Sequence, residues 1–236
     1  MMTEKIEVLN HGYALLVESW GSDERIIESA RMSTGKGFLG WGPKEDGKPG
    51  DEKLLRYLWE HKHATPFEMA GLTVEIQAPI FVFRQWHRHR TQSFNEMSAR
   101  YTPLPAVDYL PTVERLMAEA TANKQAGKAD GSAVLTEAAA QAFVDSLRET
   151  YEHAQTVYEL ALANGVPKEI ARVHLPVARY SCMRASANLR NWLAFLTLRL
   201  DPHAQYEIRV YADALGKFIA DRFPRTWELF AEGLSR

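Results

Sequence analysis

The sequence of 236 residues has little of several features that would define a protein class at once. It contains one cysteine, Cys182, which excludes an intrachain disulfide framework and a metal site built on several thiolates. No run of about 18 consecutive apolar residues occurs, and the first residues lack the basic and apolar segments of a secretory signal. These absences favour a cytoplasmic protein that does not span a membrane.

Net charge is also nearly absent, since 28 lysines and arginines face 30 acidic residues and give a formal charge of -2. This balance argues against a protein that coats nucleic acid. The even total hides two basic segments: residues 84–100 hold four arginines against Glu96, and residues 168–200 hold six lysines and arginines against Glu169. Arginine binds phosphate through paired hydrogen bonds, so the two segments predict a compact anionic ligand. Ordinary surface or interface charges would explain them equally well.

The spacing of apolar residues predicts a mostly helical α+β fold with a small antiparallel or mixed sheet. Strands are expected over residues 13–17 and 68–77. Helices are expected over residues 23–32, 51–61, 112–164, 189–200 and 204–222, with short ones from Pro79 and after Pro224. Asp201 and Pro202 have the residue types of a helix start before 204–222. No linker or repeat interrupts the chain, so we expect a single domain over residues 1–236.

Two segments stand out by composition. Residues 33–51 contain six glycines, which predicts a mobile loop, of the kind that can serve as a lid. Part of this loop resembles a P-loop, but Pro49 occupies the position of the serine or threonine that would bind magnesium. Residues 118–142 contain ten alanines, a composition that favours helix.

Several single residues could have either a catalytic or ligand-binding role or an ordinary structural one. The pairs His61/His63 and His87/His89 could bind a metal from one face of a strand, but arginines surround the second pair, and we predict no metal site. Ser98 lacks the flanking glycines of a nucleophile elbow, so it is predicted to bond a ligand. Cys182 is predicted to be a buried packing residue, although a lone cysteine can be a nucleophile.

One segment concentrates side chains that bind ligands. Residues 88–100 read Arg-His-Arg-Thr-Gln-Ser-Phe-Asn-Glu-Met-Ser-Ala-Arg. Phe94 and Met97 are interleaved with the polar residues, which is not typical of a solvated face, and a core cannot hold so many polar groups without partners. The segment therefore predicts a polyanionic ligand that makes many hydrogen bonds.

This segment resembles the signature of the flavin-dependent thymidylate synthases, Arg-His-Arg-x-x-Ser-x-Asn-Glu-x-Ser-x-Arg, at every fixed position. Further segments are similar to the family's conserved blocks, and the likeness extends over about residues 30–210. They are His63–Glu68 (His-x-Thr-Pro-Phe-Glu), Arg172–Pro176 (Arg-x-x-Leu-Pro), Asn188–Arg190, the end of a helix at Leu198 and Arg199, and His203–Ile208 (His-Ala-Gln-x-Glu-Ile).

The resemblance implies an enzyme that methylates dUMP reductively to dTMP. The carbon would come from methylenetetrahydrofolate, and electrons from NADPH would pass through bound FAD. The implied assembly is a homotetramer whose active sites are built from several subunits. The implied partners are dUMP, folate and NADPH, with no nucleic acid and no membrane.

The resemblance also implies roles for particular residues. Arg199 would be catalytic, because its positive charge can favour the ionised pyrimidine N3 without acting as a base. The expected FAD contacts are His63, Thr65, Arg88, His89, Arg90, Glu96, Asn188, Arg190 and Ala194, the last standing where many relatives have a polar residue. The expected dUMP contacts are Gln85, Trp86, Arg88, Glu96, Ser98, Ala99, Arg100, Arg172 and Arg199, with Ser98 and Arg100 at the phosphate.

Two other interpretations remain open from the sequence. The basic residues of 84–100 alternate with aromatic ones, as in proteins that bind single-stranded nucleic acid, although the acidic remainder of the chain argues against this class. A relative that keeps the fold without turnover is the other alternative, and the intact signature argues against it.

Overall fold

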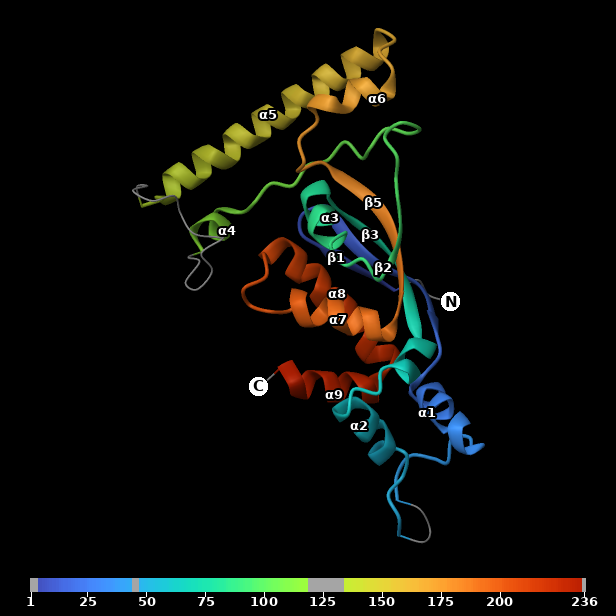
Figure 1. Ribbon diagram of the computed structural model, residues 1–236. Coiled ribbons are helices and arrows are strands. Elements are labelled where there is room, and N and C mark those ends of the chain that lie inside the picture. The colour runs from blue at the N-terminus through green and yellow to red at the C-terminus, as the bar shows by residue number, and fades with distance from the viewer. Residues whose placement is uncertain (1–3, 44–46, 119–133, 235–236) are drawn as a thin grey trace.

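The computed structural model describes residues 4–43, 47–118 and 134–234, which form an α+β fold (Figure 1). Within these ranges the centre is a sheet of five antiparallel strands in the order β1-β2-β3-β5-β4. The strands are β1 (Lys5–Val8), β2 (Gly12–Trp20), β3 (Gly71–Pro79), β4 (Ser93–Glu96) and β5 (Tyr180–Asn188). The predicted α+β class is confirmed, and the described sheet is antiparallel rather than mixed.

Two helices from the C-terminal part of the chain cover one face of the sheet. They are α7 (Leu189–Arg199) and α8 (Tyr206–Arg222). Alternate residues of β3 are fully buried, at positions 72, 74, 76 and 78. Trp192 of α7 donates its indole N–H to the backbone oxygen of Leu72, at 3.0 Å. This bond ties α7 to the central strand and so fixes where its last residue, Arg199, lies.

A smaller group of helices packs at one end of the sheet. It contains α1 (Asp23–Arg31), α2 (Glu52–Glu60), α9 (Pro224–Leu234) and the 3₁₀ helix η2 (Thr65–Met69). Asp23 accepts hydrogen bonds from the Thr226 hydroxyl at 2.6 Å and from the backbone N–H of Arg225 at 2.9 Å. A residue of α1 therefore caps α9, and the two ends of the chain are joined here.

At the opposite end of the molecule a long helix extends beyond the sheet (Figure 1). This is α5 (Glu137–Ala163), followed by the short α6 (Lys168–Ala171) and the 3₁₀ turn η4 (Arg172–His174). The region predicted to be helical over residues 112–164 contains α4 (Val113–Met117), which ends in extended backbone at Ala118, and α5, which matches the long helix predicted from Leu135 to Asn164. Residues 119–133 of the alanine-rich segment lie outside the described part of the chain.

The described residues of the glycine-rich loop are anchored at its base, and the mobility of the loop stays a prediction. A 3₁₀ turn, η1 (Met32–Thr34), leads into it. Asp51, which is fully buried, forms an ion pair with Arg31 and accepts a hydrogen bond from the backbone N–H of Leu39 at 2.7 Å. Burial of a paired carboxylate makes this anchor costly to break.

Three strands were not predicted from the sequence, and two elements begin later than predicted. β1, β4 and β5 were not predicted, and the strand expected from residue 68 begins at Gly71, after η2. The helix expected from residue 204 begins at Tyr206, because the Asp201 carboxylate accepts from the backbone N–H of His203 in a separate turn. Pro79 ends β3, and the short helix that follows is α3 (Ile80–Trp86). None of the helices described is long and apolar enough to cross a membrane.

Candidate functional site

The predicted catalytic arginine lies beside the first turn of the signature segment. Arg199, at the end of α7, donates from Nε to Nε2 of His89 at 2.8 Å. Its Nη2 donates to the backbone oxygen of Gln85, in α3, at 3.2 Å. The structure thus brings together three residues predicted for one site. In the part of the chain described, Nη1 of Arg199 has no partner, which leaves a donor available to a ligand.

Electrostatics define the protonation states in this group. Burial, together with the neighbouring charge of Arg199, lowers the pKa of His89 to about 4. His89 is therefore neutral at pH 7, and its Nε2 accepts the hydrogen bond from Arg199. Burial also lowers the pKa of Arg199, but an arginine stays protonated at neutral pH despite such a shift. Arg199 therefore carries a positive charge, and the neutral His89 accepts its hydrogen bond and fixes its position.

The signature segment continues as β4 at the edge of the sheet. Asn95 lies opposite Arg184 of β5, and the backbone N–H of Met97 donates to the Cys182 oxygen at 2.8 Å. Trp86, just before the segment, is fully buried and donates to the Gln92 side chain at 3.0 Å. The side chains of Trp86 and Ala99 are both buried, so contacts from them to a nucleotide would come from the main chain.

A cavity of about 600 Å³ lies between α2, η2 and α7. Three predicted cofactor contacts line it: His63, Arg190 and Ala194. The remaining lining combines aromatic and aliphatic side chains with charged ones: Leu58, Trp59, Glu60, Lys62, Ala64, Phe67, Leu193 and Thr197. Thr65 begins η2, directly after the lining residue Ala64.

Local backbone geometry directs His63 into this cavity. Lys62 has a φ of 56°, in the left-handed region that a non-glycine residue rarely adopts. The backbone N–H of His63 then donates to the Leu58 oxygen at 2.9 Å, which ends α2 and turns the chain. Across the cavity wall, Arg190 forms an ion pair with Glu68.

Asn188 has a structural task as well as a predicted cofactor contact. It is the N-cap of α7, and its Oδ1 accepts from the backbone N–H of Asn191 at 3.0 Å. Among the described residues its side-chain NH₂ group has no partner, so this group is available to a ligand. Arg88 and Arg90 are exposed, and neither has an ion-pair partner among the described residues. Both guanidinium groups are therefore free to bind an anion.

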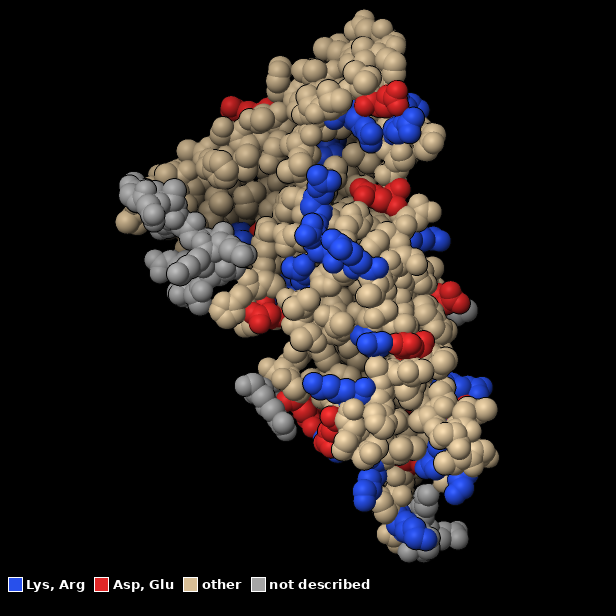
Figure 2. Space-filling view, viewed as in Figure 1, with Lys and Arg blue, Asp and Glu red and all other residues tan. Residues whose placement is uncertain are grey.

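The predicted phosphate residues form a third group, near α6. Arg100 pairs with Glu169 of α6 at 3.0 Å, and its backbone N–H donates to the Ser98 hydroxyl at 3.3 Å. Arg172 begins η4, directly after α6. Figure 1 places α6 at the opposite end of the molecule from α2. One chain therefore presents its predicted site residues as separate groups and not as one pocket. Figure 2 shows lysines and arginines in a band across the face over α3.

Other candidates from the sequence have ordinary partners. His87 contacts the Met183 sulfur at 3.1 Å, and His61 lies 3.0 Å from the Tyr57 oxygen. Among the residues described, no three His, Cys, Asp or Glu side chains gather as metal ligands. Cys182 is half-buried and 3.7 Å from the Tyr13 hydroxyl, and burial raises its thiol pKa, which disfavours the nucleophilic thiolate.

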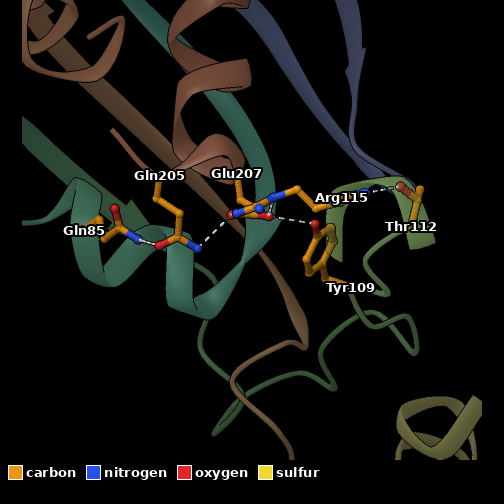
Figure 3. A network of polar contacts seen from close by, with 6 residues as sticks. All are labelled: Gln85, Tyr109, Thr112, Arg115, Gln205 and Glu207. Carbon is orange, nitrogen blue, oxygen red and sulfur yellow. Dashed lines mark hydrogen bonds and ion pairs between the residues drawn. The ribbon is translucent and has the colours of Figure 1, made fainter. Parts of the chain in front are cut away.

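A polar network that could not be recognised in the sequence reaches Gln85 from the core (Figure 3). It contains Gln205 and Glu207 at the start of α8, with Tyr109 and Arg115. The available signal was Glu207 itself, an acidic residue next to the apolar Ile208 in a segment similar to a family block. A carboxylate on the buried face of a helix needs partners.

Together these features define an α+β protein with an arginine-rich ligand site and a cavity of cofactor size. The chain matches the family described as "Thymidylate synthase complementing protein" over residues 15–225, and it belongs to that family. A flavin-dependent thymidylate synthase from Thermus thermophilus is 40% identical, over 97% of this chain and 79% of the relative. One from Rickettsia bellii is 37% identical, over 98% and 80%.

A solved structure is similar over nearly its whole length. It is the UMP/dUMP methylase PolB from Streptomyces cacaoi, bound with 5-Br UMP. The TM-score is 0.79 and the sequence identity 35%, over 96% of this chain and 97% of that one. The expected family is therefore confirmed by sequence and by fold.

Proposed function

We propose that this protein is a flavin-dependent thymidylate synthase, an enzyme that methylates dUMP to dTMP. Methylenetetrahydrofolate would supply the carbon and NADPH the electrons, by way of FAD. The observation that carries the proposal is the contact of Arg199 with His89 and Gln85. It joins the predicted catalytic arginine to the signature segment. Family membership and the names of the relatives support the same activity.

The protonated Arg199 suits the polarisation of a uracil ring. With Nε held by His89 and Nη2 by Gln85, its free Nη1 can donate to a pyrimidine oxygen or to the ionised N3. A fixed positive charge stabilises negative charge that develops on the ring, and it does so without reorganising. No cysteine adduct is needed, in keeping with the raised pKa of Cys182.

The cavity at α2 and α7 suits an FAD molecule. Its volume of about 600 Å³ and its aromatic and aliphatic wall fit a planar ring system. Arg190 and Lys62 in the same lining provide cations for a diphosphate. His63 and Thr65 offer polar contacts, whereas Ala194 offers only packing. Bound FAD would supply the transfer of electrons from NADPH.

The separate groups of site residues support assembly into a homotetramer. Ser98, Arg100 and Arg172 near α6 would bind the dUMP phosphate, with Arg100 leaving or sharing Glu169. The flavin cavity lies at the other end of the same chain (Figure 1). We propose that neighbouring subunits bring these ends together, so that each active site contains residues of several chains.

The test uses the purified protein and a variant. The wild type should show the visible absorption of a flavin, consume NADPH, and release tritium from [5-³H]dUMP when methylenetetrahydrofolate is present. Arg199→Ala should keep the flavin spectrum and lose at least about a hundredfold in turnover, the scale of removing one preorganised electrostatic contact. Arg222→Ala, a surface arginine at the end of α8, serves as the matched control.

Two results would contradict the proposal. A protein that binds neither FAD nor dUMP is not this enzyme, and near-normal turnover in Arg199→Ala would remove the role given to that residue. The same assay should include UMP, because the solved relative is described as a UMP/dUMP methylase. Methylation of UMP would make UMP a second substrate.

A further inference from the structure

A line of polar side chains connects the core of α8 with the end of α3 (Figure 3). Glu207 is 3% exposed, and its Oε2 accepts a hydrogen bond from the Gln205 amide nitrogen at 2.8 Å. The carbonyl oxygen of Gln205 in turn accepts from the amide nitrogen of Gln85. We call Gln85, Gln205 and Glu207 the amide relay.

The carboxylate at one end sets the direction of the whole relay. A carboxylate can only accept hydrogen bonds, so Gln205 must turn its NH₂ group toward Glu207. Its carbonyl oxygen then faces Gln85, which must present its own NH₂ group. The Gln85 carbonyl oxygen and its second N–H are thereby left for a ligand, in one fixed arrangement.

Glu207 is anchored on the side away from the relay. Arg115 Nε and the Tyr109 hydroxyl both donate to its Oε1, at 2.8 Å and 2.9 Å. Burial alone would raise the pKa of Glu207, but hydrogen bonds from Arg115 and Gln205 outweigh it and hold the pKa below its ordinary value. The carboxylate therefore stays ionised at neutral pH, which keeps it an acceptor.

We infer that Glu207 is a positioning residue for nucleotide recognition, acting through Gln205 on the orientation of the Gln85 amide. Gln205 is exposed, so water competes for its amide unless a buried charge holds it. The backbone oxygen of Gln85 also accepts from Arg199, so the relay ends at the proposed catalytic group. The inference rests on the proposed function, because it takes Gln85 as a contact of dUMP.

The experiment measures KM for dUMP, kcat and the thermal midpoint of the full-length holoenzyme. In Glu207→Gln the donors Arg115 and Tyr109 keep the amide oxygen on their own side, so the NH₂ group faces Gln205 and the direction of the relay is reversed. In Gln205→Met the relay is interrupted while Glu207 keeps Arg115 and Tyr109. Each variant should raise KM by about tenfold, the scale of one hydrogen bond to a ligand, and change kcat by less than about threefold. The double variant should be no worse than either single one.

Tyr109→Phe is the matched control. It removes a hydrogen bond to the same carboxylate, but on the side away from the relay. It should lower the thermal midpoint and leave KM within about twofold. If Tyr109→Phe raises KM as much as Glu207→Gln does, the effect is structural and the inference is overturned.

Gln85→Ala separates the inference from the proposed function. A normal KM in Gln85→Ala would mean that dUMP does not lie against Gln85, which overturns both that placement and the positioning role. A raised KM in Gln85→Ala with normal values in Glu207→Gln and Gln205→Met overturns the positioning role alone. If Glu207→Gln does not fold, Gln205→Met decides the question, because it leaves the buried ion pair intact.

Discussion

At the scale of single residues, the chemistry depends on which group carries a proton. His89 and Arg199 could both be positive, and two adjacent charges would repel each other. This repulsion is avoided because burial, together with the charge of Arg199, lowers the pKa of His89 to about 4 and leaves a neutral acceptor for the guanidinium. The sequence identified both residues through the family signature. It could not show their contact, since 110 positions separate them.

The pKa of His89 predicts a pH dependence of stability. The unfolded chain binds a proton at an ordinary histidine pKa of 6.5, whereas the folded protein does so only near 4. The contribution of His89 to the free energy of unfolding is therefore fully present above about pH 6.5. It is lost as the pH falls toward 4, by about 2–3 kcal/mol in all. In His89→Gln, which can still accept from Arg199, this component should be absent.

The measurement is urea unfolding of wild type and His89→Gln between pH 4.5 and 7.5. Carboxylates also titrate in this range, so the difference between the two proteins is the quantity of interest. The difference in free energy of unfolding between wild type and His89→Gln should become smaller as the pH falls, because only the wild type loses the stability that comes from a neutral His89. Two parallel curves would show that His89 titrates normally in the folded protein.

At the scale of elements, strongly periodic helices could be predicted from the sequence and polar strands could not. The helices expected over residues 23–32, 51–61 and 189–200 agree with α1, α2 and α7 to within a residue or so at each end. β5 was missed because its residues are mainly alanine, serine and polar types with low strand preference. It becomes a strand because β3 and β4 pair with it on both sides, which only the folded chain supplies.

The junction of β5 and α7 gives a second prediction, at Asn188. Its Oδ1 caps α7, so only its NH₂ group can serve the cofactor. Asn188→Ala removes both functions and should lower stability by about 1 kcal/mol. Asn188→Asp keeps the capping oxygen but loses the N–H donor, so its stability should stay within about 0.5 kcal/mol of wild type. Flavin affinity should fall in both variants.

Urea unfolding of the apoprotein and flavin titration by fluorescence measure the two functions separately. Asn188→Asp is the informative variant, because its cap is intact. If it binds flavin as tightly as wild type does, Asn188 caps the helix and does not contact the cofactor through its amide.

At the scale of the whole molecule, the predicted phosphate-binding residues and the predicted cofactor-binding residues of the cavity lie at two ends of an elongated chain. Arg100 and Arg172 lie near α6, whereas His63 and Arg190 lie at the cavity by α2 (Figure 1). The sequence identified members of both groups through short motifs. It could not give their separation, because motifs carry no distances between segments that fold apart. The proposed tetramer explains how one active site could still use both groups.

The long helix α5 provides the test of that assembly. Phe143 and Val157 are exposed by 50% and 38%, and their spacing of 14 residues places them near one face of the helix. Exposed apolar side chains on a projecting helix favour an interface between subunits. The double variant Phe143→Lys with Val157→Lys should therefore give a smaller species in analytical ultracentrifugation. It should also reduce the rate of methylation at least about tenfold, because burying two lysines at an interface is unfavourable.

The control Glu152→Lys, on the opposite face of α5, should change neither the size of the species nor the rate of methylation. Circular dichroism should show wild-type helix content in both proteins. A double variant that keeps the wild-type mass and activity would mean that α5 does not form the interface.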